Sequence, residues 1–161
     1  MKPAELLTVL RECHRDKLTA RQRHVAVAKQ VGDYEFNNTY QYIINREDVQ
    51  LQWLEAAIAD LAGTPDVVAE PTLPARGRKD SILPLVAEDA RQAADFVAKW
   101  KPRAAKMTQA RHRTMMGVIL GETLEQKRFF DQMTAGNDDL LGRRHRSVGT
   151  GDGVMAVRWI E

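Results

Sequence analysis

The chain has 161 residues, of which 43% are hydrophobic and 29% charged, a composition typical of one globular domain and not of a disordered chain. Its formal net charge of +2 is too small to indicate a nucleic acid or an anionic membrane as partner. Cys13 is the only cysteine, and the sequence shows neither a signal peptide nor the run of roughly 20 apolar residues that a membrane span needs, so we expect a cytoplasmic protein.

The first part of the chain predicts two helices joined by a short turn. Apolar residues recur every three or four positions over residues 4–31 and again over 34–62, and Gly32-Asp33 interrupts the pattern between them. The apolar stripe of the second helix runs from Tyr40 to Leu61 and includes Glu47 near its middle. We therefore expect a helical hairpin that carries a carboxylate on its inner face.

A long connection over residues 63–80 follows the first hairpin. The helical periodicity stops there, and prolines and glycines punctuate the segment. A connection of about 18 residues is long enough to run the length of a bundle, which would leave the second and third helices parallel. The sequence thus favours an antiparallel four-helix bundle with a long crossover between its second and third helices.

The second part of the chain predicts another hairpin and then a tail. A third helix is expected over 81–100, where Lys101-Pro102 would end it, and a fourth over 104–134. The bundle would then occupy residues 1–135. Residues 136–161 combine a basic cluster, a glycine-rich stretch and an apolar end. We expect an all-α fold with an irregular tail that packs on the bundle or on a second subunit, and a homodimer or larger homo-oligomer.

Carboxylates on the apolar stripes form the candidate site. A buried carboxylate without a partner is costly, so it normally meets a cation or a metal ion. Glu47 and Glu122 lie near the middles of the second and fourth helices, and we expect them to face each other across the interior. Two sets of partners lie at the same level of the hairpins: Glu12 with Glu88, or His14 with Asp89. The first set follows a weak internal repeat at an offset of 75–76 residues, and the second lies better on the apolar stripes.

In helix order, hairpin spacing and crossover position, residues 4–134 resemble the ferritin-like superfamily, which includes rubrerythrins and other di-iron carboxylate proteins. The resemblance implies metal ligands from a Glu on each of two helices and a Glu-x-x-His on each of the other two. Gln50 and Glu125 stand where those histidines would be, three residues after Glu47 and Glu122. The candidate metal ligands are Glu47, Glu122, Glu12, Glu88, Glu125, Gln50, His14 and Asp89.

The missing histidines leave the cofactor open. A metal, if one is held, would be iron or manganese, and a site of oxygen ligands alone would suit harder ions such as Mn²⁺, Mg²⁺ or Ca²⁺. If no metal is held, the buried glutamates need a proton or a cation such as Lys17, Arg46 or Lys127.

Three functions remain open. The missing histidines favour a ferritin-like structural or binding module whose metal site is degenerate or absent. The alternative is a metal-dependent oxidoreductase, a ferroxidase or peroxidase, that uses a carboxylate-rich centre. A third, a DinB-like bundle with a histidine triad, is disfavoured by the spacing of His14, His24 and His112. We expect His14 to be a hydrogen-bonded core residue and the other two to be solvated.

Overall fold

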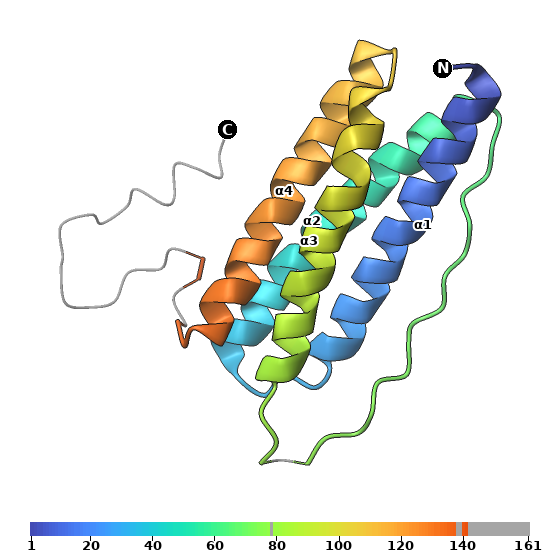
Figure 1. The fold of residues 1–161 in the computed structure, drawn as a ribbon. Coiled ribbons are helices and arrows are strands. Elements are labelled where there is room, and N and C mark those ends of the chain that lie inside the picture. Colours follow the sequence, from blue (N-terminus) through green and yellow to red (C-terminus); the bar gives the residue numbers. More distant parts are fainter. Residues whose placement is uncertain (78, 138–139, 142–161) are drawn as a thin grey trace, which may run out of the picture.

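The computed structural model describes residues 1–77, 79–137 and 140–141. Within these ranges the chain forms four α-helices and no β-strand, as Figure 1 shows. The helices are α1 (Pro3–Ala28), α2 (Tyr34–Ala59), α3 (Leu83–Ala105) and α4 (Ala110–Thr134). The expectation of an all-α fold with four helices is confirmed. In the part of the chain that the structure describes, no helix combines the length and apolarity that crossing a membrane requires.

Signals in the sequence explain most of the helix ends. Pro3 opens α1, where a residue without an N–H group is tolerated. The Asp33 carboxylate accepts a hydrogen bond of 2.9 Å from the backbone N–H of Phe36 and so caps the start of α2. Gly136 follows α4 with a φ of 87°, the left-handed conformation that favours glycine after a helix.

The turn between α3 and α4 lies later in the chain than the sequence predicts. Helix α3 does not end at Trp100 but continues through Pro102 to residue 105, and α4 begins at residue 110 instead of 104. Contacts with α1 hold the extra turn, because Trp100 is fully buried and Arg103 forms an ion pair of 2.8 Å with Glu12. These contacts outweigh the tendency of Pro102 to end a helix.

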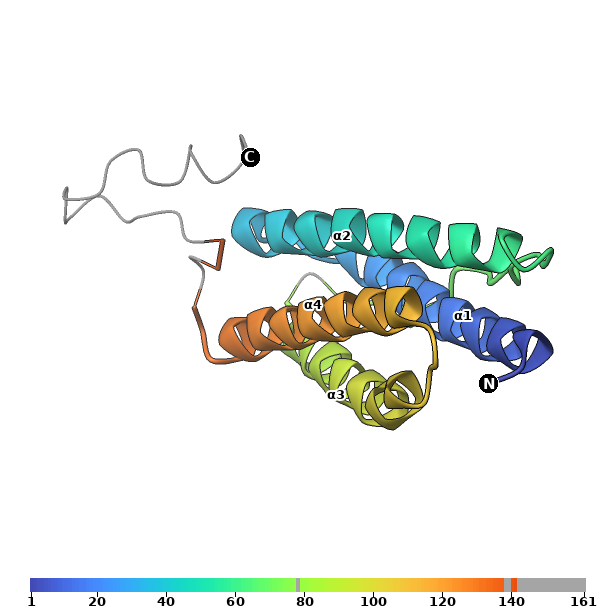
Figure 2. The same cartoon turned by 90° about the horizontal axis from the view of Figure 1, so that it is seen from above.

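The helices pack as two hairpins, α1 with α2 and α3 with α4. The closest packing lies within each hairpin, and the hairpins meet through α1 against α3 and α2 against α4. Figure 2 shows the two hairpins as two layers. Side chains that reach between the layers therefore decide what the centre of the molecule contains.

The connection between α2 and α3 runs beside α1 (Figure 1). Near its start, Asp66 forms an ion pair of 2.5 Å with Arg11, and near its end the carbonyl group of Pro74 accepts a hydrogen bond of 3.2 Å from Gln30. Because its contacts move from Arg11 to Gln30, the connection follows α1 in the same direction over most of the helix. Gln22 of α1 and Gln30, just after α1, thus donate hydrogen bonds to the carbonyl groups of Val68 and Pro74 in a segment that forms few backbone hydrogen bonds of its own.

Two apolar clusters fill the ends of the molecule. One surrounds Trp100 and Met116, the other surrounds Tyr40 and Phe130, and each draws side chains from all four helices. Between them lie buried polar residues from every helix, which we call the central polar layer: Lys17, His24, Glu47, Gln50, Asp89, Thr123 and Gln126. This layer contains the candidate site.

Candidate functional site

Lys17 places an ammonium group at the centre of the molecule. Its side chain is 1% exposed, and Nζ lies 3.2 Å from Oε1 of Glu47 on α2. The ammonium group also donates hydrogen bonds to Thr123 Oγ1 at 3.2 Å and Gln126 Oε1 at 3.3 Å on α4, and it lies 5.3 Å from the centre of the Phe96 ring on α3. One cation of α1 therefore contacts the other three helices, as a buried charge requires.

Glu47 is fully buried and has a second partner on α1. Nδ1 of His24 lies 2.9 Å from Oε2, while Lys17 faces Oε1. Burial by itself raises the pKa of Glu47, but His24 and Lys17 outweigh burial and hold that pKa below its usual value. Burial by itself lowers the pKa of His24, but the Glu47 carboxylate outweighs it and raises that pKa. The carboxylate is therefore ionised at neutral pH.

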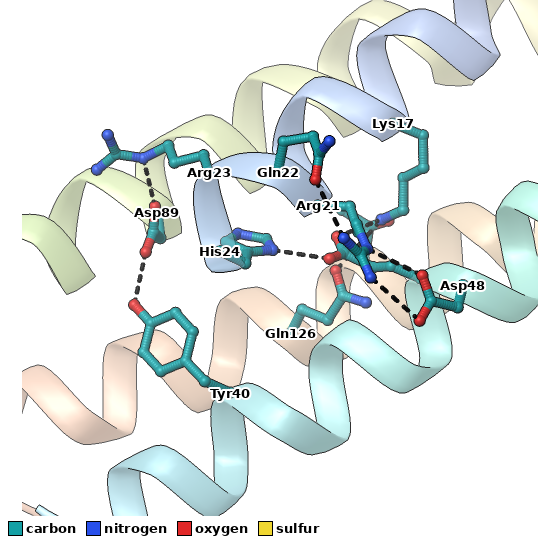
Figure 3. A network of polar contacts seen from close by, with 11 residues as sticks. Lys17, Arg21, Gln22, Arg23, His24, Tyr40, Asp48, Asp89 and Gln126 are labelled. Carbon is teal, nitrogen blue, oxygen red and sulfur yellow. Dashed lines mark hydrogen bonds and ion pairs between the residues drawn. The ribbon is translucent and has the colours of Figure 1, made fainter. Parts of the chain in front are cut away.

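Asp89 of α3 is a second buried carboxylate, held by both helices of the first hairpin. Arg23 donates from Nε to Oδ1 at 2.6 Å, and the Tyr40 hydroxyl group donates to Oδ2 at 2.5 Å (Figure 3). Burial and the neighbouring Asp89 raise the pKa of Tyr40, so the phenol remains a protonated donor. The charge of Asp89 is thus balanced within the chain and ties α3 to α1 and α2.

Glu122 does not face Glu47 across the interior, so that expectation is wrong. Its side chain is 21% exposed at the edge between α4 and α2, where it contacts Arg46 and Gln50 of α2. Helix α4 instead turns Thr123 toward the centre. Gln50 is buried as a donor to Glu122, not as a partner of Glu47.

The other predicted glutamates pair on the surface. Glu12 forms ion pairs with Lys99 of α3 at 2.9 Å and with Arg103 at 2.8 Å. Glu88 pairs with Arg91 on its own helix at 2.5 Å, and Glu125 pairs with Arg128 at 3.6 Å. All three side chains are partly exposed, and the structure does not bring them to Glu47.

The three histidines among the described residues, His14, His24 and His112, are buried, which corrects part of the sequence interpretation. His14 is a hydrogen-bonded core residue as expected, with Nε2 lying 3.1 Å from Oε1 of Glu55. His24 and His112 were expected to be solvated, and that expectation is wrong. The neighbouring arginines suggested exposure, but the His24 ring packs against Phe130 with ring centres 5.2 Å apart.

The central side chains do not fit a di-iron centre. In residues 1–77, 79–137 and 140–141, no three His, Cys, Asp or Glu side chains converge as ligands of a metal ion would. The carboxylate of Glu47 already faces an ammonium and an imidazole group, and Asp89 faces a guanidinium group. A cation held at the centre repels a metal ion and occupies the place beside the Glu47 carboxylate that a metal ion would take.

The neutralising cations could be found from the sequence only in part. Lys17 at Glu47 and Arg46 at Glu122 are two of the three predicted candidates, whereas Lys127 pairs with Asp131 at 2.5 Å. The roles of His24 and Gln126 were missed. His24 lies seven residues after Lys17, two helical turns along the same face, and that spacing is the signal that could have identified it.

Two features of the surface complete the candidate sites. On α4, the exposed fractions of Val118 and Leu124 are 42% and 51%, and the glycines beside them have open space around Cα. A hollow of about 410 Å³ opens there, lined by Gly121, Glu122, Leu124, Glu125 and Arg128. A second groove, of about 500 Å³, lies between α1 and α2 and is crossed by the ion pair of Arg21 with Asp48 at 2.9 Å.

The chain matches no protein-family model, no curated protein and no solved structure. Its function therefore has to be inferred from the central polar layer and from the exposed surfaces.

Proposed function

We propose that the chain is a ferritin-like bundle that serves as a structural or binding module. The observation that carries the proposal is the Lys17 ammonium group, which lies among Glu47, Thr123 and Gln126. The order of the helices, the two hairpins and the connection beside α1 support a crossover bundle of the ferritin-like type. The absence of a membrane-spanning helix from the described ranges fits the cytoplasmic site of action that we propose.

The central polar layer explains how such a bundle can hold together without a metal. In a di-metal carboxylate protein, the metal ions neutralise buried carboxylates and leave positions open for oxygen or peroxide. Here Lys17 and His24 neutralise Glu47, and Arg23 neutralises Asp89. These groups link the helices as metal ions would, but they offer no open coordination position.

Melting with and without EDTA separates this proposal from the alternative of a metal-dependent oxidoreductase. If the centre holds no metal, EDTA leaves the melting temperature of the wild type unchanged. Glu47→Gln should then destabilise by about 3–5 kcal/mol, because it leaves the buried Lys17 without its counterion. If the centre holds a metal, EDTA lowers the melting temperature of the wild type but not that of Glu47→Gln.

Glu125→Gln is the matched control for that experiment. Glu125 is another glutamate of a long helix, but it is partly exposed and pairs with Arg128 one turn away. Its substitution should change stability by no more than about 0.5 kcal/mol. A similar loss of stability in Glu125→Gln and Glu47→Gln would show that the buried ion pair has no special role.

We further propose that the module forms a homodimer through the exposed face of α4. Two α4 helices could pack antiparallel around a twofold axis at Gly121. Val118 of each copy would then contact Leu124 of the other copy, which gives two equivalent contacts. Gly117 and Gly121 face open space, since a Cβ atom built at either position has no neighbour within 4 Å, and without side chains they would let the two backbones approach closely. The exposed apolar side chains would thereby be covered.

Gly121→Glu tests the dimer by sedimentation equilibrium. The wild type should sediment at tens of micromolar as a dimer of the 18.2 kDa chain, and the variant as a monomer. Glutamate is a better helix former than glycine by about 0.5–1 kcal/mol, so loss of the dimer could not be attributed to unfolding. Ala56→Glu, on the exposed face of α2, should leave the dimer intact. A monomeric wild type would refute the proposed interface.

A further inference from the structure

Lys17, Glu47 and Gln126 combine a nucleophile, a proton acceptor and an electrophile in a core from which water is excluded. The three side chains come from α1, α2 and α4, and their exposed fractions are 1%, 0% and 3%. Nζ of Lys17 lies 3.3 Å from the carbonyl oxygen of the Gln126 amide and 3.2 Å from Oε1 of Glu47. Nε2 of the same amide is buried and has no hydrogen-bond partner among the described residues.

This geometry places the amine beside the amide group that it would attack. The same ammonium group touches both the acceptor of its proton and the carbonyl group that it would attack, so no group has to be brought in from elsewhere. An amide nitrogen held by hydrogen bonds resists departure, whereas Nε2 of Gln126 is held by none in the described structure. We propose that Lys17 and Gln126 form an intramolecular isopeptide bond with loss of ammonia.

The reaction balances without an oxidant or a cofactor. Oε1 of Glu47 takes one proton from the Lys17 ammonium group. The freed electron pair on Nζ then forms a bond to Cδ of Gln126, and the electron pair of the carbonyl double bond moves to Oε1 of Gln126. A second proton then moves from Nζ to Nε2 within the tetrahedral intermediate, in which both nitrogen atoms are bonded to Cδ. The carbonyl group then reforms, the Cδ–Nε2 bond breaks, and ammonia leaves as ammonium with the proton that Glu47 first accepted.

The product improves the balance of charge in the core. Before the reaction, Lys17 and protonated His24 both face the single carboxylate of Glu47. Afterwards one imidazolium group faces one carboxylate, and a neutral amide replaces the buried ammonium. The bond would also join α1 to α4, helices of different hairpins that contact each other through side chains such as His24 and Phe130 but whose backbones do not approach closely. Its role would be to fasten the two hairpins covalently.

Mass spectrometry of the intact wild-type chain tests the proposal. The measured mass should fall short of the sequence mass by one ammonia molecule. Trypsin should then release residues 16–21, uncut after Lys17, joined to residues 114–127. Lys17→Arg and Glu47→Gln should both show the full sequence mass, whereas Thr123→Val, which keeps all three reacting groups, should retain the deficit.

Two outcomes would overturn the proposal. The first is a wild-type mass equal to the sequence mass after prolonged incubation of the folded protein. The second is a mass deficit without the joined peptides, since an imide formed at an asparagine also loses ammonia. Neither readout depends on metal content or on assembly, so this inference and the proposed function can fail independently.

Discussion

His24 and Glu47 set the pH dependence expected at the scale of single residues. The imidazole and the carboxylate lie 2.9 Å apart, the pKa of Glu47 is lowered from about 4.5, and that of His24 is raised from about 6.5. The contribution of Glu47 to stability is present above its unfolded pKa and is lost as pH falls through its lowered folded pKa. The contribution of His24 is fully present below its unfolded pKa and is lost as pH rises through its raised folded pKa.

Stability should therefore be greatest between the unfolded pKa of Glu47, about 4.5, and the unfolded pKa of His24, about 6.5. Two other groups face His24: Asp89 of α3 raises its pKa further and Lys17 of α1 opposes that rise. Urea unfolding at a series of pH values should show a decline as pH rises through the folded pKa of His24, and His24→Gln should lose that decline. An NMR titration placing the His24 midpoint at or below the ordinary value would contradict the assignment.

The inner face of α4 shows why the sequence located some site residues and not others. The apolar pattern correctly predicted that Glu47 is buried. On α4, however, the buried stripe runs through Ile119, Thr123 and Gln126, and Glu122 lies one position off it. Two of those inward residues are polar, so apolarity does not mark the inner face there. Their burial depends on Lys17, a residue more than a hundred positions away.

At the scale of secondary structure elements, the end of α2 carries a strained residue. Ala62 has a φ of 56°, a conformation unfavourable for a residue with a Cβ atom, and its side chain is exposed. Hydrogen bonds of 2.9 Å from its N–H to Ala59 and of 3.0 Å from Gly63 to Ile58 hold it there. Ala62→Gly should therefore stabilise the protein by about 0.5–1 kcal/mol, since relief of strain exceeds the added freedom of the unfolded chain.

Ala59→Gly is the control for that prediction. Ala59 is also exposed but lies within the last turn of α2, where glycine should cost about 1 kcal/mol. Chemical denaturation of both variants should show a higher free energy of unfolding for Ala62→Gly and a lower one for Ala59→Gly. Equal destabilisation by the two substitutions would mean that the strain at Ala62 contributes nothing measurable.

Periodicity predicted the existence of all four helices, but it could not place the turn between α3 and α4. The turn is decided by contacts distant in sequence: the Trp100 indole donates to Asp16 of α1 at 2.9 Å, and Arg103 pairs with Glu12. Pro102 by itself disfavours the helical conformation, but the contacts with α1 outweigh that tendency. The length of the connection was likewise evident from its prolines, whereas its contacts with Arg11 and Gln30 depend on the fold.

At the scale of the whole molecule, the two hairpins should remain associated when the connection between them is cut. Each apolar cluster draws side chains from all four helices, and the central polar layer links the hairpins through Lys17 and Asp89. The connection, by contrast, runs beside α1 (Figure 1), and its Leu73 packs against one apolar cluster as a partly buried side chain. Its contribution should therefore be chiefly to keep the hairpins at high effective concentration.

A site-specific protease sequence inserted after Ala75, which is exposed, tests that expectation. After cleavage the protein should keep its helical circular dichroism and its elution volume, but its melting temperature should become dependent on concentration. The same insertion after Thr108 should be harmful even before cleavage, because it would separate Arg113 from the carbonyl groups of Met107 and Thr108, which it contacts at 2.7 and 2.6 Å. Separation of the cleaved hairpins on a native column would show that the connection, and not the core, holds them together. In denaturant the hairpins should still migrate as one species if Lys17 and Gln126 are covalently joined, and as two if the polar layer is only hydrogen-bonded.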